Sequence, residues 1–184
     1  YENPVVSELT KLGAEFFFTP PQGFTEHSLV NRCGGLTAAG PGETKALKQY
    51  LATWRSHCPE LIHIGPQEAR DIVPILRDDW LSGAAWDPSW HSIDVHELLS
   101  GYIRGLRANG AVLKNKATVT GLAQRANSWV IKAGGESLNA DVVVNAAGAW
   151  ANHIATLAGA RTLPLTPMRR TAAIAPAPEN SEAW

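Results

Sequence analysis

The segment DVVVNAAGAWANHIATLA, residues 141–158, constrains the fold of this chain more than any other part of the sequence. Its run from Val142 to Asn145 is typical of a strand that is covered on both faces, because a strand with one wet face alternates apolar and polar residues. The small residues from Ala146 to Gly148 follow at once, and a helix ending at Gly159 is expected next. This order of elements predicts a domain that mixes helices with sheet.

The small residues of this segment also make it a candidate nucleotide site. Small side chains let a ligand approach the backbone, and the start of a helix offers free amides and the positive end of its dipole. Close packing between a strand and a helix requires small residues as well. Both interpretations stay open on these residues alone.

Other helices are predicted from the spacing of apolar residues and from the residues that stop them. The predicted ranges are 4–18, which Pro20-Pro21 ends, 43–58, and 67–73, which Pro74 ends. The clearest signal lies further on, where Asp94 is an expected N-cap for a helix over 95–108. Glu97 completes a pattern resembling a capping box, in which carboxylate oxygens satisfy unpaired amides.

Strands are predicted from short apolar or β-branched runs between turn residues. The Gly134-Gly135 pair supplies a tight reversal, because glycine tolerates positive φ, and Ser137-Leu138 is expected to pair back across it. A break is expected at Gly34-Gly35. The predicted ranges are 29–38, 80–86, 111–114, 118–125, 129–133 and 168–175.

The charge and cysteine content exclude several classes of partner. The formal net charge is -1 and the basic residues are scattered, so neither nucleic acid nor an anionic membrane surface is expected. Cys33 and Cys58 are too few for a disulfide scaffold and lack metal-ligand spacing, which favours a reducing cytoplasm. No apolar run approaches the ~20 residues that cross a bilayer. The charged fraction, 18%, is low enough that part of the surface is expected to be covered, and a homo-oligomer stays open.

A metal site and a hydrolase active site are two other possibilities, and neither is expected. His91, Asp94 and His96 lie close together in the sequence, as metal ligands do, but the helix cap already explains Asp94, so no metal is expected. A Ser-His-Asp hydrolase is not supported, because the chain has no G-x-S-x-G turn.

Several motifs in the same order resemble one family. Residues 140–151, ADVVVNAAGAWA, resemble the ADxVVNAAGxWA signature of the FAD-dependent oxidoreductases that include D-amino-acid oxidase and glycine oxidase, the DAO family. The passage WDPSWHSIDVHELLSGYIRGLRANGAVLKNKATVTGL is similar to that family's helix, Gly-Ala hinge and strand. LPLTPMRRTAAI and the opening YENPVVSELTKLGAEFFFTPPQGF are similar to the family's flanking segments. The resemblance covers nearly all of this chain and about half of a family member.

The resemblance implies a mixed α/β (α+β) fold that is a fragment of a two-domain FAD-binding oxidoreductase. Residues 1–24 and 88–165 would belong to the FAD-binding side. Residues 25–87 and 166–184 would belong to an antiparallel substrate-side sheet whose helices cover one face.

The resemblance also implies a set of residues around the adenosine end of FAD. Val119 would contact the adenine side through its backbone, Ala146, Ala147 and Gly148 would line the adenosine or ribose, and Trp150 would wedge the start of the helix. Without a cofactor, Val119 is a strand core residue and Trp150 a packing aromatic. Arg169 could hold a substrate carboxylate with its fork, or be a solvated or domain-bridging residue.

The implied activity is oxidation of the C–N bond of a small amine or amino acid, such as glycine, sarcosine or a D-amino acid, by hydride transfer to flavin N5. The family's GxGxxG loop and its substrate-clamping residues have no counterpart here, so the catalytic residues stay unknown. We therefore expect an incomplete chain that is inactive alone and does not hold FAD tightly. Two alternatives stay open: a non-catalytic interaction module derived from the family, or a dehydrogenase acting on a hydroxy acid or glycerol phosphate.

Overall fold

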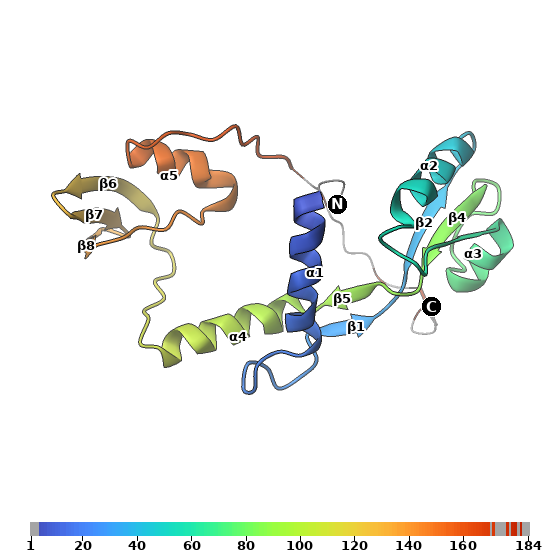
Figure 1. Ribbon diagram of the computed structural model, residues 1–184, viewed down its shortest axis with the longest axis horizontal. Coiled ribbons are helices and arrows are strands. Elements are labelled where there is room, and N and C mark those ends of the chain that lie inside the picture. Colours follow the sequence, from blue (N-terminus) through green and yellow to red (C-terminus); the bar gives the residue numbers. More distant parts are fainter. Residues whose placement is uncertain (1–3, 170, 172–175, 177, 180, 182–184) are drawn as a thin grey trace. The chain divides into compact units, whose positions relative to one another are not determined.

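The computed structural model describes residues 4–169, 171, 176, 178, 179 and 181. They form two compact units (Figure 1). The first contains the described residues up to Ala111 together with residues 178, 179 and 181, and the second contains the described residues from Val112 to Pro176. Helices and antiparallel strands occur together, which confirms the mixed fold class. None of the helices in the described part of the chain has both the length and the apolar composition needed to cross a membrane.

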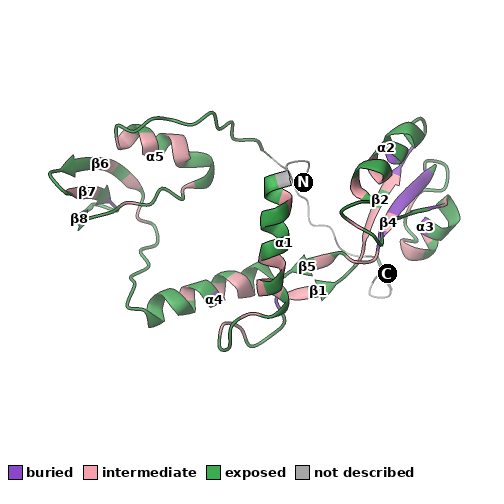
Figure 2. Ribbon diagram, viewed as in Figure 1, coloured by how far each residue is buried: buried purple, intermediate pink, exposed green. Residues whose placement is uncertain are grey.

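A three-stranded antiparallel sheet lies at the centre of the first unit. It consists of β2 (Gly35–Ala39), β4 (Gly83–Asp87) and β3 (Ile62–Ile64), in that spatial order. The central strand β4 carries most of the buried positions, as Figure 2 shows. Its alanines leave room for larger residues from the elements above and below the sheet.

The helices α2 (Thr44–Trp54) and α3 (Pro66–Ile72) cover opposite faces of this sheet. Neighbouring residues of a strand point to opposite faces. Ala85 packs in one cluster with Leu47 of α2, and Ala84 packs in another with Ala69 of α3. The expectation that the helices cover one face is therefore wrong, because each face of β4 is apolar and needs its own cover.

The rest of the first unit joins two helices to a two-stranded ribbon. The helices are α1 (Pro4–Phe18) and α4 (Val95–Ala108), and β1 (Val30–Arg32) pairs with β5 (His91–Ile93). An aromatic cluster joins α1 to α4, because the ring of Phe16 lies 5.9 Å from that of Tyr102 and 4.9 Å from that of Phe24.

The predicted N-cap of α4 is confirmed. The backbone N–H of Glu97 donates to Asp94 Oδ1 over 2.8 Å. The carboxylate of Glu97 turns instead to Thr25 and Arg104, whose side chains donate to its Oε1 over 3.0 and 2.8 Å. The two carboxylates therefore serve different purposes: one caps the helix and the other ties it to the preceding loop.

The second unit is built on a β-meander. Its strands β6 (Val119–Arg125), β7 (Ser128–Ala133) and β8 (Glu136–Ala140) are antiparallel and in sequence order. The predicted reversal at Gly134 and Gly135 is confirmed, and both have positive φ. The short helix η1 (Gly148–Trp150) leads into α5 (Ala151–Leu157), which contacts β6. Gly159, just past α5, has positive φ as expected.

The covered strand expected from Val142 to Asn145 does not form. Residues 142–147 have no regular structure, and Val142 and Val144 are 75% and 82% exposed. A strand is held by hydrogen bonds to a neighbouring strand, and none of the described strands pairs with this segment. The β-branched run therefore favours an extended conformation, but no described strand lies beside it to form the hydrogen bonds of a sheet.

Other strand predictions need smaller corrections. Residues 111–114 are irregular, and the run over 29–38 divides at Gly34 into β1 and β2, which join different sheets. The strand over 80–86 begins only at Gly83, and β3 and β5 were not predicted, because strands this short carry little sequence signal. The strand over 168–175 lies largely outside the described residues.

The predicted division into cofactor-side and substrate-side parts stays a prediction. It concerns the parts of a cofactor and substrate site, whereas the boundary between the two compact units falls in the sequence after Ala111.

Candidate functional site

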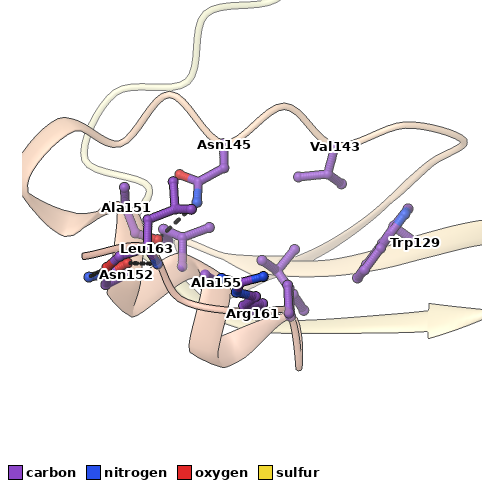
Figure 3. Close-up of a pocket in the computed structure, with 12 residues that line it drawn as sticks. Trp129, Val143, Asn145, Ala151, Asn152, Ala155, Arg161 and Leu163 are labelled. Carbon is purple, nitrogen blue, oxygen red and sulfur yellow. Dashed lines mark hydrogen bonds between the residues drawn. The ribbon is translucent and has the colours of Figure 1, made fainter. Parts of the chain in front are cut away.

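The segment between β8 and α5 is held in place by one side chain, Asn145. Its Nδ2 donates to the carbonyl of Ala151 over 2.9 Å, and its Oδ1 accepts from the N–H of Ala147 over 3.3 Å. Figure 3 shows the Asn145 amide turned toward the start of the helix. Asparagine commonly bonds to the backbone two residues on, which closes a tight turn. Asn145 therefore fixes the path of the small residues that follow it.

Three of the predicted cofactor residues lie directly in that turn. Ala146 and Gly148 are exposed and Ala147 is half-buried. Gly148 has φ 54°, and a Cβ added to it would meet no atom within 4 Å. The main chain here is open on one side, as close approach of a ligand requires, and Gly148 adopts a conformation that other residues resist.

Trp150 and Val119 occupy different surroundings. The backbone N–H of Trp150 donates to the carbonyl of Ala147 over 3.0 Å, and the residue is 70% exposed. Val119 is the half-buried first residue of β6 and pairs with Ala133, next to a bulge before Gly121. Their roles as wedge and adenine contact stay predictions.

A pocket of about 340 Å³ lies beside this turn, between α5 and the meander. Its walls are mostly apolar and include Leu122, Trp129, Val143 and Ile154, with polar groups from Asn145, Asn152 and Arg161. Figure 3 shows Val143 and Trp129 at one end of the pocket and Asn152 near the other. The five predicted cofactor residues are not among its lining residues, so the exposed turn and the pocket are neighbouring but separate features.

Asn152 was not predicted as a site residue, yet it braces the pocket. Its Nδ2 donates to the carbonyl of Leu163 over 2.8 Å, and its Oδ1 accepts from the N–H of Leu163 over 2.9 Å. The side chain therefore pairs with a distant backbone as a neighbouring strand would. Asn145 was not predicted as a site residue either. Its position directly before Ala-Ala-Gly is typical of a turn, and this signal could have identified it.

The candidate substrate contact Arg169 and the candidate metal ligands do not form a site in the described residues. Arg169 is exposed and lies in an irregular segment. His91 contacts the carbonyl of Ser89 through Nδ1 over 2.7 Å and the ring of Phe18, and Asp94 caps α4. No group of three or more His, Cys, Asp or Glu side chains that could hold a metal occurs in the described residues.

Comparison with known proteins decides the family. The DAO family of FAD dependent oxidoreductases matches residues 5–184. This chain belongs to that family. Its members are FAD-dependent enzymes, which confirms the resemblance found in the sequence and the family's cofactor.

Sequence relatives and solved structures agree with this assignment. Mitochondrial dimethylglycine dehydrogenase of Homo sapiens is 29% identical over 133 residues, which are 72% of this chain and 15% of the relative. L-proline dehydrogenase from P. horikoshii has a TM-score of 0.60 and 26% identity, covering 85% of this chain and 40% of that one. Glycine oxidase from Geobacillus kaustophilus has a TM-score of 0.67 at 20% identity, covering 84% and 41%. The chain thus spans less than half the length of each.

One further structure shares the fold alone. The FAD-bound L-alpha-glycerophosphate oxidase from Mycoplasma pneumoniae has a TM-score of 0.63 at 16% identity, and the match covers 86% of this chain and 43% of that one. At this identity the likeness concerns the path of the chain only.

The predicted contact of this turn with the adenosine half of FAD stays a prediction. What the structure shows is that Ala146 and Gly148 are exposed and that a Cβ added to Gly148 would meet no atom within 4 Å. A pyrophosphate is normally held by a strand, a GxGxxG turn and the N-terminus of a helix, and the 184 residues contain no GxGxxG.

Proposed function

We propose that this chain is part of an FAD-dependent oxidoreductase that oxidises a small amine or amino acid at its C–N bond. The match to the FAD dependent oxidoreductase family over residues 5–184 carries the proposal. The substrate class is supported by relatives named for dimethylglycine and L-proline. When bound, the cofactor supplies a hydride acceptor, flavin N5.

In this proposal the chain's own residues hold the adenosine end of the cofactor. Asn145 keeps the turn closed, the main chain from Ala146 to Gly148 lies against the adenosine or ribose, and the backbone of Val119 contacts the adenine side. Trp150 packs against the cofactor domain at the start of the helix. Arg169 is a weaker candidate for a substrate carboxylate, because it is exposed and lies well beyond this turn in the sequence.

An oxidoreductase of a hydroxy acid or of glycerol phosphate is the alternative within the family. The glycerophosphate oxidase structure favours it only at the level of fold. The amine substrate is preferred, because the dimethylglycine and L-proline dehydrogenases are more similar in sequence.

The purified chain provides a direct test. We expect visible flavin absorbance far below one FAD per chain and no oxidase activity, because no GxGxxG loop holds the pyrophosphate. We also expect ADP, added as an adenosine probe, to shift the backbone amide NMR signals of residues 145–150 and of Val119. A near-stoichiometric yellow cofactor would overturn the proposed inability to retain FAD, and ADP-dependent shifts confined to other residues would overturn the adenosine site.

A matched pair of variants separates the site from general strain. Gly148 and Gly135 lie in the same unit, and both have positive φ and open space beyond their Cα atoms. Gly148→Val should weaken ADP binding about tenfold, a difference of about 1.4 kcal/mol, whereas Gly135→Val should leave it unchanged. Equal effects of the two would assign the loss to backbone strain and contradict the site.

The location and assembly of the protein remain part of the proposal. A reducing cytoplasm is supported by the free thiols of Cys33 and Cys58, although the human relative is named as mitochondrial. Cell fractionation with an antibody to this chain would decide between the two. A homo-oligomer stays a prediction that sedimentation can check.

A further inference from the structure

A second cavity, of about 400 Å³, lies in the first unit on the face of the sheet that α2 covers. Tyr50, Trp54 and Trp90 provide aromatic walls, and Asp87 also lines it. The rings of Tyr50 and Trp54 are 6.4 Å apart. The indole of Trp90 lies so close to Gly35 that a Cβ there would overlap it. The aromatic walls therefore come from regular elements: Tyr50 and Trp54 belong to α2, and Trp90 packs against the first residue of β2.

Asp87 is the unusual member of this cavity. The residue is 2% exposed, and its Oδ1 accepts hydrogen bonds from the N–H and the hydroxyl of Ser89. Its Oδ2 has no hydrogen-bond partner among the described residues and is closed to bulk water. A buried carboxylate oxygen without a partner is costly, and native proteins rarely leave one unpaired.

No cationic side chain among the described residues forms an ion pair with this carboxylate. The ion pairs of the described residues do not include Asp87, and the cavity lining contains no Lys, Arg or His. Cys58 is a titratable neighbour that lines the same cavity. Burial raises the pKa of the Cys58 thiol, and the charge of Asp87 and a hydrogen bond to its carboxyl raise that pKa further. A raised pKa keeps Cys58 a neutral thiol, so Cys58 adds no charge of its own beside Asp87.

We propose that this cavity binds a small organic cation, an alkylated ammonium group, between Asp87 and the rings of Tyr50, Trp54 and Trp90. Aromatic faces attract a cation through their quadrupole, most strongly where water is excluded. Asp87 lies within the wall of the cavity, and its Oδ2 is closed to a group the size of water, so the carboxylate attracts the cation by charge and without direct contact. The rings take up the alkyl substituents. The cavity volume lies within the range of small-molecule sites, roughly 300–1,000 Å³.

Other ligand classes fit less well. A divalent metal needs several oxygen or nitrogen ligands, and Asp87 belongs to no metal-ligating cluster in the described part of the chain. An anion would be repelled by the carboxylate. A neutral apolar ligand would leave the carboxylate without an opposite charge.

The experiment titrates the 184-residue chain, without flavin, with tetramethylammonium chloride. The indole N–H NMR signals of Trp54 and Trp90, assigned with Trp54→Phe and Trp90→Phe, report the binding. We expect saturable shifts of both signals and no saturable shift with tert-butanol, a neutral molecule of similar shape. Equal responses to the two molecules, or no saturable response to tetramethylammonium, would overturn the proposal.

Two further arms define the site. Asp87→Asn keeps the shape and removes the charge, so it should weaken tetramethylammonium binding about tenfold or more. Asp71→Asn, on the exposed side of α3, should not change it. If Asp87→Asn does not fold, the comparison with tert-butanol on the unmodified chain still decides. A titration with guanidinium tests whether the natural cation is an arginine side chain. Tighter binding of guanidinium than of tetramethylammonium would indicate arginine and contradict a free alkylammonium ligand.

Discussion

Gly148 is the residue at which the chain leaves the irregular segment and enters the helices η1 and α5. Its φ of 54° lies in the left-handed region, where a side chain is strained even though the space around it is empty. Gly105, inside α4, also has empty space around it but no such φ. The two glycines therefore separate the cost of the backbone conformation from the cost of crowding.

Gly148→Ala should lower the free energy of unfolding of the second unit by about 1 kcal/mol, because alanine resists positive φ. Gly105→Ala should raise that of the first unit by roughly 0.5–1 kcal/mol, because alanine is the better helix former. Both changes in the free energy of unfolding can be measured by urea denaturation, with hydrogen exchange as the signal for each unit. A stabilising Gly148→Ala would mean that the residue does not hold a left-handed conformation.

At the scale of elements, α4 is fixed by the chemistry of its first turn. The N–H of Glu97 is capped by Asp94, while its carboxylate accepts from Arg104 and Thr25. The Arg104 guanidinium, followed by the Thr25 hydroxyl, lowers the pKa of Glu97 below its ordinary value. Folding therefore favours the ionised form of this residue.

The lowered pKa gives a pH dependence of known sign. The contribution of Glu97 to stability is fully present above the ordinary glutamate pKa, about 4.3, and is lost as pH falls through the lower pKa of the folded state. Glu97→Gln should therefore reduce the melting temperature at neutral pH, and its difference from the unchanged chain should shrink in acid. Glu15→Gln, on the exposed part of α1, is the control. A difference that stays constant down to acid pH would contradict the pKa shift.

At the scale of the whole molecule, the chain consists of two compact units, and both clusters of buried apolar residues found in the described part of the chain lie in the first. Leu47 is 5% exposed beneath α2 in the first, and Leu122 lines the pocket beside α5 in the second. Compact units commonly open as separate cooperative units. The whole chain is therefore expected to lose its structure in two steps.

Leu47→Ala should destabilise the first unit by about 2–5 kcal/mol, because it leaves a cavity in a packed core. Hydrogen exchange with mass spectrometry should then show faster exchange in β2, β3 and β4, with β6, β7 and β8 unchanged. Leu122→Ala should give the reverse pattern with a smaller effect, because its surroundings are more open. Faster exchange in both units from either variant would show that the chain unfolds as one body.

Much of the candidate site could be predicted from the order of residues, and part of it could not. The turn from Ala146 to Gly148 was selected because small residues follow a β-branched run, and the structure places them in an open turn. The bracing by Asn152 could not be predicted, because its partner Leu163 is fixed only when the chain folds back beside α5. Asp87 is likewise an ordinary aspartate in the sequence, and its Oδ2 becomes buried and unpaired only in the folded first unit.

Features that depend on a few neighbouring residues follow directly from the local sequence. Asp94 starts α4, Pro20-Pro21 ends α1, and Gly134-Gly135 reverses the meander, because capping bonds and glycine or proline dihedrals are local. The family signature was readable for the same reason. The tertiary structure alone decided which strands pair and which faces are covered. Residues 142–145 have a strand's composition and form none here, because a ladder needs hydrogen bonds from a second strand that the local sequence does not supply.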